Sequence, residues 1–145
     1  SDLDKTNDLI NNIRVDLSTS QIFKVLVVED NRINQLVTKK IMEKNLYKCC
    51  VVDDGYEALK ILETEIFDII LMDINMPLLN GFETTRLIRN KNNTTPIIAL
   101  TAFDKEEISE EAISAGMNDI IIKPFDQSKL FKAMSTLIYD AKNVG

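Results

Sequence analysis

The stretch Phe67-Asp-Ile-Ile-Leu-Met-Asp73 is an almost continuous apolar run that ends on a carboxylate. Such a run, short and rich in isoleucine, is typical of a strand buried on both faces of a parallel sheet. Similar runs at 24–29, 96–101 and 119–123, and a weaker one at 47–52, alternate with stretches of helical apolar spacing. This alternation predicts an α/β domain with a doubly wound parallel sheet of five strands, with residues 47–52 at an edge.

Two of the expected helices are indicated by apolar residues at helical spacing, and we expect both apolar stripes to face the core. The stripes consist of Ile33, Leu36, Val37 and Ile41 in the first helix and of Leu130, Met134, Leu137 and Ile138 in the last. Helix starts are predicted at Asn80 and Asp104, because each stands three residues before a glutamate, as in a capping box. Asp126 is expected to cap the last helix.

The composition fits a single ordinary domain, since the chain has 145 residues of which 45% are hydrophobic. We expect the domain at 24–140, after a linker or N-terminal extension at 1–23 and before a C-terminal tail at 141–145. The net charge of -6 argues against a nucleic-acid partner. There is neither a run of about 20 apolar residues nor a basic segment followed by an apolar one, so we expect a cytoplasmic location without direct membrane contact.

The chain contains no histidine, and its two cysteines, Cys49 and Cys50, are adjacent. A disulfide between neighbours would be badly strained, so we interpret both as plain strand residues. The lack of histidine excludes Ser-His and Cys-His catalysis and an ordinary zinc site. Any bound metal is therefore expected to have oxygen ligands, with Mg²⁺ the first choice.

Polar residues stand at the carboxyl ends of the predicted strands, where ligands bind in doubly wound sheets. Glu29 and Asp30 follow the first strand, Asp73 ends the third, Thr101 ends the fourth and Lys123 ends the fifth. Each alone has a simpler interpretation, as a helix cap, a turn residue, a strand residue or a surface lysine. Their convergence at one edge, with complementary charges, favours a functional site.

The three carboxylates would repel one another, and one lysine cannot neutralise them, so the pattern predicts a Mg²⁺ site. The expected ligands are Asp30, Asp73 and the backbone carbonyl of Asn75, with Glu29 acting through a water or as an inner ligand. Asp73 is the expected nucleophile toward phosphorus and would form an acyl phosphate, assisted by the Lys123 ammonium and the Thr101 hydroxyl. With only four glycines, the chain has no phosphate-binding loop for ATP or NAD.

These residues resemble the receiver domain of two-component response regulators over 24–139. The resemblance rests on Glu29-Asp30, Asp73-Ile-Asn-Met-Pro77 with Gly81, Thr101-Ala102 and Lys123-Pro124-Phe125. It implies a flavodoxin-like fold with strand order 2-1-3-4-5. It also implies phosphorylation of Asp73 by a phosphohistidine, dependence on Mg²⁺ and a cis peptide before Pro124.

Two further segments, Val28–Gln35 and Ala99–Ala102, resemble receivers attached to hybrid sensor histidine kinases. The resemblance implies a histidine kinase domain or a histidine phosphotransfer protein as partner, and makes a membrane-anchored kinase a candidate for the parent chain. Because the chain has no histidine, the phosphodonor must be another chain or a region outside this sequence. The domain itself is expected only to promote phosphoryl transfer to Asp73 and the subsequent slow hydrolysis of the acyl phosphate.

Three alternatives stay open. One is a stand-alone single-domain response regulator. Another is a Mg²⁺-dependent phosphatase with an aspartyl nucleophile, similar to haloacid dehalogenase-like hydrolases. Those enzymes usually carry a second acid two residues after the nucleophile, where this chain has Asn75. The third is a flavodoxin-like binder of a nucleotide or flavin, which ranks last.

One position departs from the receiver pattern. Receivers usually carry Tyr or Phe three residues before the lysine, and this ring turns inward as the threonine moves; here the position is Ile120. Thr101 and Ile120 are thus the expected switch residues, and we expect a weaker relay to the face formed by the fourth helix, the fifth strand and the last helix. The family also implies that partner choice resides around Ile33, Leu36 and Val37 and in the loop after Asp73.

Overall fold

The computed structural model describes residue 5 and residues 21–143. Most of the expected N-terminal extension therefore lies outside the described residues. The strands are β1 (Lys24–Val28), β2 (Lys48–Val52), β3 (Ile69–Asp73), β4 (Ile97–Thr101) and β5 (Asp119–Ile122). The helices are α2 (Arg32–Lys44), α3 (Gly55–Ile61), α4 (Gly81–Asn90), α5 (Lys105–Ala115) and α6 (Gln127–Asn143). The last helix thus runs past residue 140, where the domain was expected to end.

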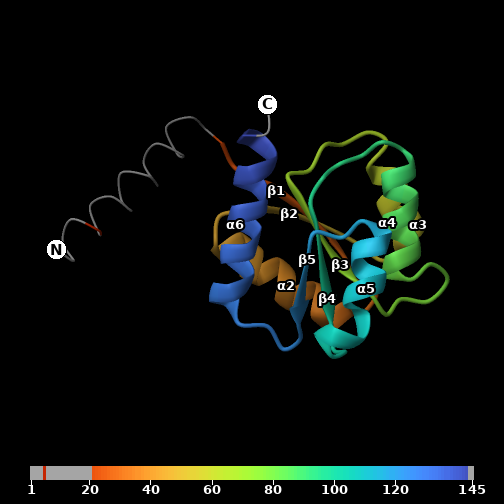
Figure 1. Ribbon diagram of the computed structural model, residues 1–145. Helices are drawn as coiled ribbons and strands as arrows, with labels where there is room; N and C mark the ends of the chain where they lie inside the picture. Colours follow the sequence, from red (N-terminus) through yellow and green to blue (C-terminus); the bar gives the residue numbers. More distant parts are fainter. Residues whose placement is uncertain (1–4, 6–20, 144–145) are drawn as a thin grey trace.

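The five strands form one parallel sheet in the order β2-β1-β3-β4-β5, which confirms the predicted topology. Helices α2 and α6 cover one face of the sheet, and α3, α4 and α5 cover the other (Figure 1). This order makes β1 and β3 neighbours, with Val28 opposite Met72 in the register. The residues that follow Val28 and Met72 therefore emerge side by side at the carboxyl edge.

Both faces of the sheet are apolar because successive side chains of a strand point to opposite sides. In β3, Ile70 and Met72 belong to the hydrophobic cluster under α3, α4 and α5. Ile69 and Leu71 belong to the cluster under α2 and α6. Burial on both sides explains why the decisive stretch reads as one continuous apolar run.

The prediction for the apolar stripe of α2 was wrong for three of its four residues; the fourth, Ile41, is half-buried and packs against the core. Ile33, Leu36 and Val37 are 71%, 62% and 51% exposed, and the buried residues of this helix are Gln35, Thr38 and Met42. A buried glutamine is tolerated because its amide donates hydrogen bonds to the Glu29 carbonyl and to Asp53 Oδ1, both at 2.6 Å. The helix is therefore rotated so that Gln35 and Met42 face the sheet. The hydrogen bonds of Gln35 fix the start of the helix, and Met42 packs into the core near its end.

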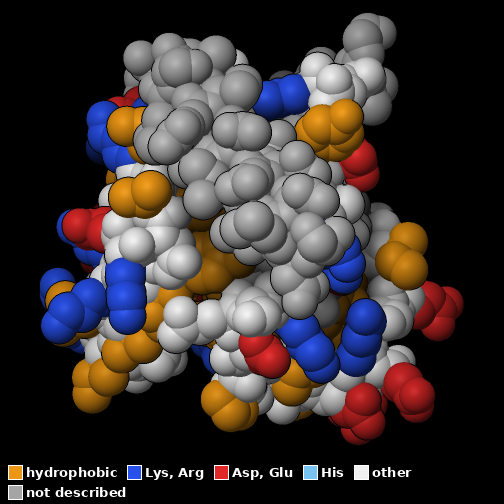
Figure 2. All heavy atoms as spheres, turned by 90° about the vertical axis from the view of Figure 1, so that its left-hand side faces the viewer, with side chains coloured by type: hydrophobic (Ala, Val, Ile, Leu, Met, Phe, Trp, Pro, Cys, Tyr) orange, Lys and Arg blue, Asp and Glu red, His pale blue; other side chains and the backbone are white. Residues whose placement is uncertain are grey.

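The stripe of α6 follows the prediction, since Leu130, Met134 and Ile138 are buried and Leu137 is half-buried. Figure 2 faces the left-hand side of Figure 1, where α6 lies, and shows hydrophobic side chains exposed among basic and acidic ones. Of the helices in the described part of the chain, none combines the length and the apolar character needed to cross a membrane.

The predicted helix starts are present, with one difference in detail. Asn80 and Glu83 form the predicted capping box. Asp104 caps α5 by accepting a hydrogen bond from the Glu106 N–H, but it forms no capping box with Glu107. Asp126 Oδ1 accepts a hydrogen bond from the Ser128 N–H at 2.8 Å, as a cap of α6 should.

Candidate functional site

The predicted carboxylates meet at the carboxyl edge of the sheet. Glu29 and Asp30 directly follow β1, and Asp73 is the last residue of β3. One carboxylate oxygen from each of the three residues lies within 4.8 Å of the others. Glu29 and Asp73 are only 3% and 7% exposed, whereas Asp30 is exposed to solvent. The site therefore has a buried base and an open side.

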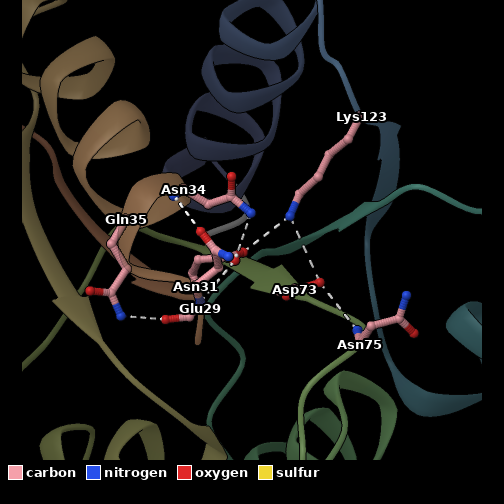
Figure 3. A network of polar contacts seen from close by, with 7 residues as sticks. All are labelled: Glu29, Asn31, Asn34, Gln35, Asp73, Asn75 and Lys123. Atoms are coloured by element: carbon pink, nitrogen blue, oxygen red, sulfur yellow. Dashed lines mark hydrogen bonds and ion pairs between the residues drawn. The ribbon is translucent and has the colours of Figure 1, made fainter.

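Lys123 reaches the same edge from the residue after β5. Its Nζ lies 3.1 Å from Glu29 Oε2 and 3.9 Å from Asp73 Oδ1 (Figure 3). A single ammonium is thus shared between two buried carboxylates and is nearer to Glu29. The peptide bond between Lys123 and Pro124 is cis, as the family pattern predicts.

The buried, negatively charged surroundings make the Asp73 carboxyl a weaker acid than usual. Burial raises the pKa of the Asp73 carboxyl to about 7, against the opposing effect of Lys123, and the neighbouring Glu29 carboxylate raises it further. One lysine therefore does not compensate the negative charge of the cluster. The donor set, three carboxylates with one exposed member, fits a hard divalent cation such as Mg²⁺.

Asn75 and Thr101 lie beside this cluster. The Asn75 N–H donates a hydrogen bond to Asp73 Oδ1 at 3.1 Å, while its side chain points away from Asp73 (Figure 3). Thr101 ends β4, next to β3, and is fully buried. Its Oγ1 accepts a hydrogen bond from the Phe103 N–H at 3.0 Å. Thr101 is therefore near the predicted nucleophile, with its hydroxyl held by the backbone of the following loop.

Glu29 is held by the start of α2 through residues of the segment 28–35, to which the sequence assigned no role of their own. Its Oε1 accepts hydrogen bonds from Asn34 Nδ2 at 3.1 Å and from the Asn31 N–H at 3.3 Å (Figure 3). The Gln35 amide holds the Glu29 backbone carbonyl. The signal that could have indicated these contacts is the presence of three residues with amide side chains, Asn31, Asn34 and Gln35, shortly after Glu29 and Asp30.

Ile120 lies in β5 opposite Ala99. Its side chain is buried in the cluster that also contains Ile108, Ala112 and Met117. The position where other receivers place a mobile ring is thus occupied here by an aliphatic side chain packed into the core.

The fold and the site define a doubly wound α/β domain with an acidic cation site, a lysine and a threonine at the carboxyl edge of its sheet. The response regulator receiver domain family matches residues 25–135, and the chain belongs to this family. It is a phosphoacceptor receiver domain of two-component signalling.

Sensor kinases are among its relatives. The CAI-1 autoinducer sensor kinase/phosphatase CqsS of Vibrio cholerae is 36% identical over 118 residues, which are 79% of this chain and 17% of CqsS. Hybrid signal transduction histidine kinase I of Dictyostelium discoideum is 35% identical over 135 residues, which are 86% of this chain and 8% of that kinase. The chain thus spans less than a fifth of the length of either relative.

A solved structure also matches. The receiver domain of sensor histidine kinase PA1611 from Pseudomonas aeruginosa, with a magnesium ion coordinated in its active-site cleft, is 38% identical, with a TM-score of 0.75. The match covers 81% of this chain and 98% of that domain. These comparisons confirm the expected likeness to receivers of sensor kinases.

Proposed function

We propose that this chain accepts a phosphoryl group on Asp73 from a phosphohistidine in trans, in a Mg²⁺-dependent step of a histidine-to-aspartate relay. The supporting observation is the cluster of Glu29, Asp30 and Asp73, whose carboxylate oxygens lie within 4.8 Å, with the Lys123 ammonium beside it. Receivers act with histidine kinases and phosphotransfer proteins as a family, and this chain has no histidine of its own.

In the proposed step, an Asp73 carboxylate oxygen attacks the phosphorus atom and forms the O–P bond of an acyl phosphate. The P–N bond of the phosphohistidine breaks, and the departing imidazole keeps the electron pair and takes up a proton. The Lys123 ammonium, 3.9 Å from Asp73 Oδ1, neutralises a phosphoryl oxygen, and the Thr101 hydroxyl donates to another once it leaves the Phe103 N–H.

The cation is assigned to Asp30, Asp73 and the backbone carbonyl of Asn75, with Glu29 as an inner ligand or acting through a water. When bound, Mg²⁺ supplies charge neutralisation at the phosphoryl oxygens and favours the ionised form of Asp73. The magnesium in the PA1611 receiver, 38% identical to this chain, supports this assignment.

The phosphatase alternative finds less support. An aspartyl phosphatase of that kind needs an acid to protonate the leaving group, and this chain has Asn75 two residues after Asp73. An amide cannot serve as that acid, and the Asn75 side chain points away from Asp73 (Figure 3). These features favour a phosphoacceptor with slow hydrolysis over a dedicated hydrolase.

We place the chain in a hybrid histidine kinase, because a hybrid kinase and a sensor kinase/phosphatase are among its relatives. In that context the domain lies in the cytoplasm. Immunoblotting of the native organism with an antibody to this domain distinguishes the alternatives. A polypeptide several times longer than 145 residues supports the kinase context, whereas one near that length supports a stand-alone response regulator.

We assign partner docking to the exposed apolar surface of α2, formed by Ile33, Leu36 and Val37. The helix begins just after Asp30, so this surface lies beside the site. Leu36→Glu is expected to slow phosphoryl transfer from a phosphohistidine protein while labelling by acetyl phosphate stays unchanged. Ile113→Glu, at an exposed apolar residue of α5, is the matched control. Equal transfer rates for the two variants would exclude the α2 surface.

The function is tested by incorporation of base-labile phosphate from acetyl phosphate into the wild type and into Asp73→Asn, with and without Mg²⁺. Labelling that requires both Asp73 and Mg²⁺ supports the proposal. Labelling that persists in Asp73→Asn would show that the nucleophile is another residue.

A further inference from the structure

Glu29 is the most completely occupied side chain of the site. Its carboxylate is 4% exposed, and both oxygens have partners. Oε2 faces the Lys123 ammonium at 3.1 Å, and Oε1 accepts from Asn34 Nδ2 at 3.1 Å and from the Asn31 N–H at 3.3 Å (Figure 3). In the described part of the chain, Asn34 supplies the one side-chain amide that donates to this carboxylate.

The position of Asn34 is set by the start of α2. Its backbone N–H donates to the side chain of the helix cap, Asn31 Oδ1, at 3.0 Å. This leaves the Asn34 side-chain amide free to turn toward Glu29, while Gln35, the next residue, holds the Glu29 backbone carbonyl. Helix α2 therefore contacts Glu29 at two places: the backbone carbonyl of Glu29 and one of the two oxygens of its carboxylate, Oε1.

The other carboxylate oxygen of Glu29, Oε2, competes with Asp73 for the Lys123 ammonium. The ammonium is 0.8 Å closer to Glu29 than to Asp73, from 3.1 Å against 3.9 Å. To stabilise a phosphoryl group on Asp73, it must loosen its contact with Glu29. Mg²⁺ would stand on the Asp73 side of Glu29, but a buried carboxylate that loses its ammonium partner is still destabilised unless other donors remain.

We propose that Asn34 is a positioning residue that holds the charge of Glu29 and thereby allows Lys123 to turn toward a phosphoryl group on Asp73. The inference rests on the proposed function. The amide is suited to this task because it is neutral and does not compete with the ammonium for the phosphoryl group. Its hydrogen bond to the Glu29 carboxylate contributes most when Lys123 has turned away, since that oxygen pair then has fewer other donors.

The test measures two affinities: that for Mg²⁺ alone, and that for the phosphoryl mimic beryllium trifluoride at saturating Mg²⁺. Asn34→Leu has nearly the same shape but cannot donate, and it keeps the backbone hydrogen bond to Asn31. We expect mimic affinity to weaken about tenfold, the usual size for a lost hydrogen bond to a charged group. Affinity for Mg²⁺ alone should change by less than about twofold, a difference too small to count as a lost ligand.

Two further variants separate positioning from general damage. Asn34→Asp cannot donate when ionised and adds a negative charge, so it should bind Mg²⁺ at least as tightly as the wild type but bind the mimic more weakly. In a Glu29→Gln background, Asn34→Leu should have no further effect, because residue 29 then has no charge to hold. Asn90→Leu, at an exposed asparagine of α4 far along the chain, is the control for an asparagine-to-leucine change.

The outcomes are distinct. Wild-type mimic affinity in Asn34→Leu would overturn the inference and leave the proposed function intact. A parallel loss of Mg²⁺ and mimic affinity would also overturn it, because Asn34 would then act on the cation site. Failure of the wild type to bind the mimic with Mg²⁺ would count against the proposed function itself. Asn34→Ala repeats the test with a strong helix former, so that folding is secured.

Discussion

Glu29 and Asp73 are two buried carboxylates that share one ammonium, and the chemistry of the site follows from this imbalance. Lys123 contacts both, and Asp30 adds a third negative charge at the solvent side. Burial raises the pKa of Asp73 to about 7, so a bound cation would increase the ionised fraction of this carboxylate at neutral pH. The charge balance of these residues thus favours binding of a cation.

Burial also determines the reactivity of Cys49 in β2. Its surroundings raise the pKa of the thiol to about 12. Alkylation by iodoacetamide at pH 8.5 should therefore be at least about tenfold slower in the native protein than in denaturant, where the thiol returns to its ordinary pKa near 9. Mass spectrometry of timed samples measures both rates, and equal rates would contradict the burial of this thiol.

The raised pKa of Cys49 also affects stability. Between about pH 9 and 12 the thiol ionises in the unfolded chain but not in the folded one, so the free energy of unfolding falls as the pH rises through this range.

The charged residues of the site could be predicted because strands of a parallel sheet end at a common edge. Glu29, Asp30, Asp73 and Lys123 each directly follow or end a recognisable apolar run. Asn34 could not be predicted in the same way, because its contact depends on how α2 is rotated against the sheet. That rotation is set by tertiary packing, which spacing alone does not reveal.

At the scale of elements, α2 is the clearest case of packing that overrides apolar spacing. Three large apolar side chains of this helix face solvent, whereas Gln35 and Met42 face the sheet. The amide of Gln35 is satisfied by the Glu29 carbonyl and by Asp53, so its burial is not penalised. The exposed stripe is then available for a partner.

A pair of truncations on α2 tests this orientation. Met42 is fully buried, so Met42→Ala should lower the free energy of unfolding by about 2–4 kcal/mol. Leu36 is 62% exposed, so Leu36→Ala should change it by no more than about 0.5 kcal/mol. Urea unfolding followed by circular dichroism measures both values. Similar losses for the two variants would mean that the predicted inward stripe was right after all.

The start of α4 shows why a glycine follows the loop after Asp73. A Cβ at Gly81 would lie 2.5 Å from the Asp73 carbonyl oxygen and 2.9 Å from Ile74 Cα, both backbone atoms that cannot easily move. The Gly81 N–H donates to the Ile74 carbonyl at 3.0 Å. The small residue thus lets the helix hold the loop that follows Asp73, the proposed phosphoacceptor.

At the scale of the whole molecule, a parallel sheet with helices on both faces could be predicted because four of the strands are nearly continuous apolar runs. The strand order was implied by the resemblance to receivers, since apolar runs do not reveal which strands are neighbours. The ends of elements were less certain, since helix ends depend on capping contacts such as the one at Asp104. What the sequence predicts beyond the fold is a difference in signal transmission. Ile120 is packed in the core under α5 where a mobile aromatic ring is expected.

We therefore expect the phosphoryl mimic to change the surface near Asp73 and Thr101 but to be relayed only weakly to β5 and α6. Amide chemical shifts with and without beryllium trifluoride measure this reach. Ile120→Phe should extend the shifts into α6, because a ring can adopt the inward and outward positions that the aliphatic side chain lacks. Large shifts across α6 in the wild type would contradict the expectation.

The central claim is that Asp73 becomes the acyl phosphate, and its most direct test identifies the modified residue chemically. The protein is phosphorylated with acetyl phosphate and Mg²⁺, reduced with borohydride and digested, and its peptides are sequenced by mass spectrometry. Homoserine is expected at position 73 and nowhere else, and none is expected when Mg²⁺ is omitted. Homoserine at position 30, or unreduced Asp73 in a protein that carries the label, would contradict the assignment of the acyl phosphate to Asp73.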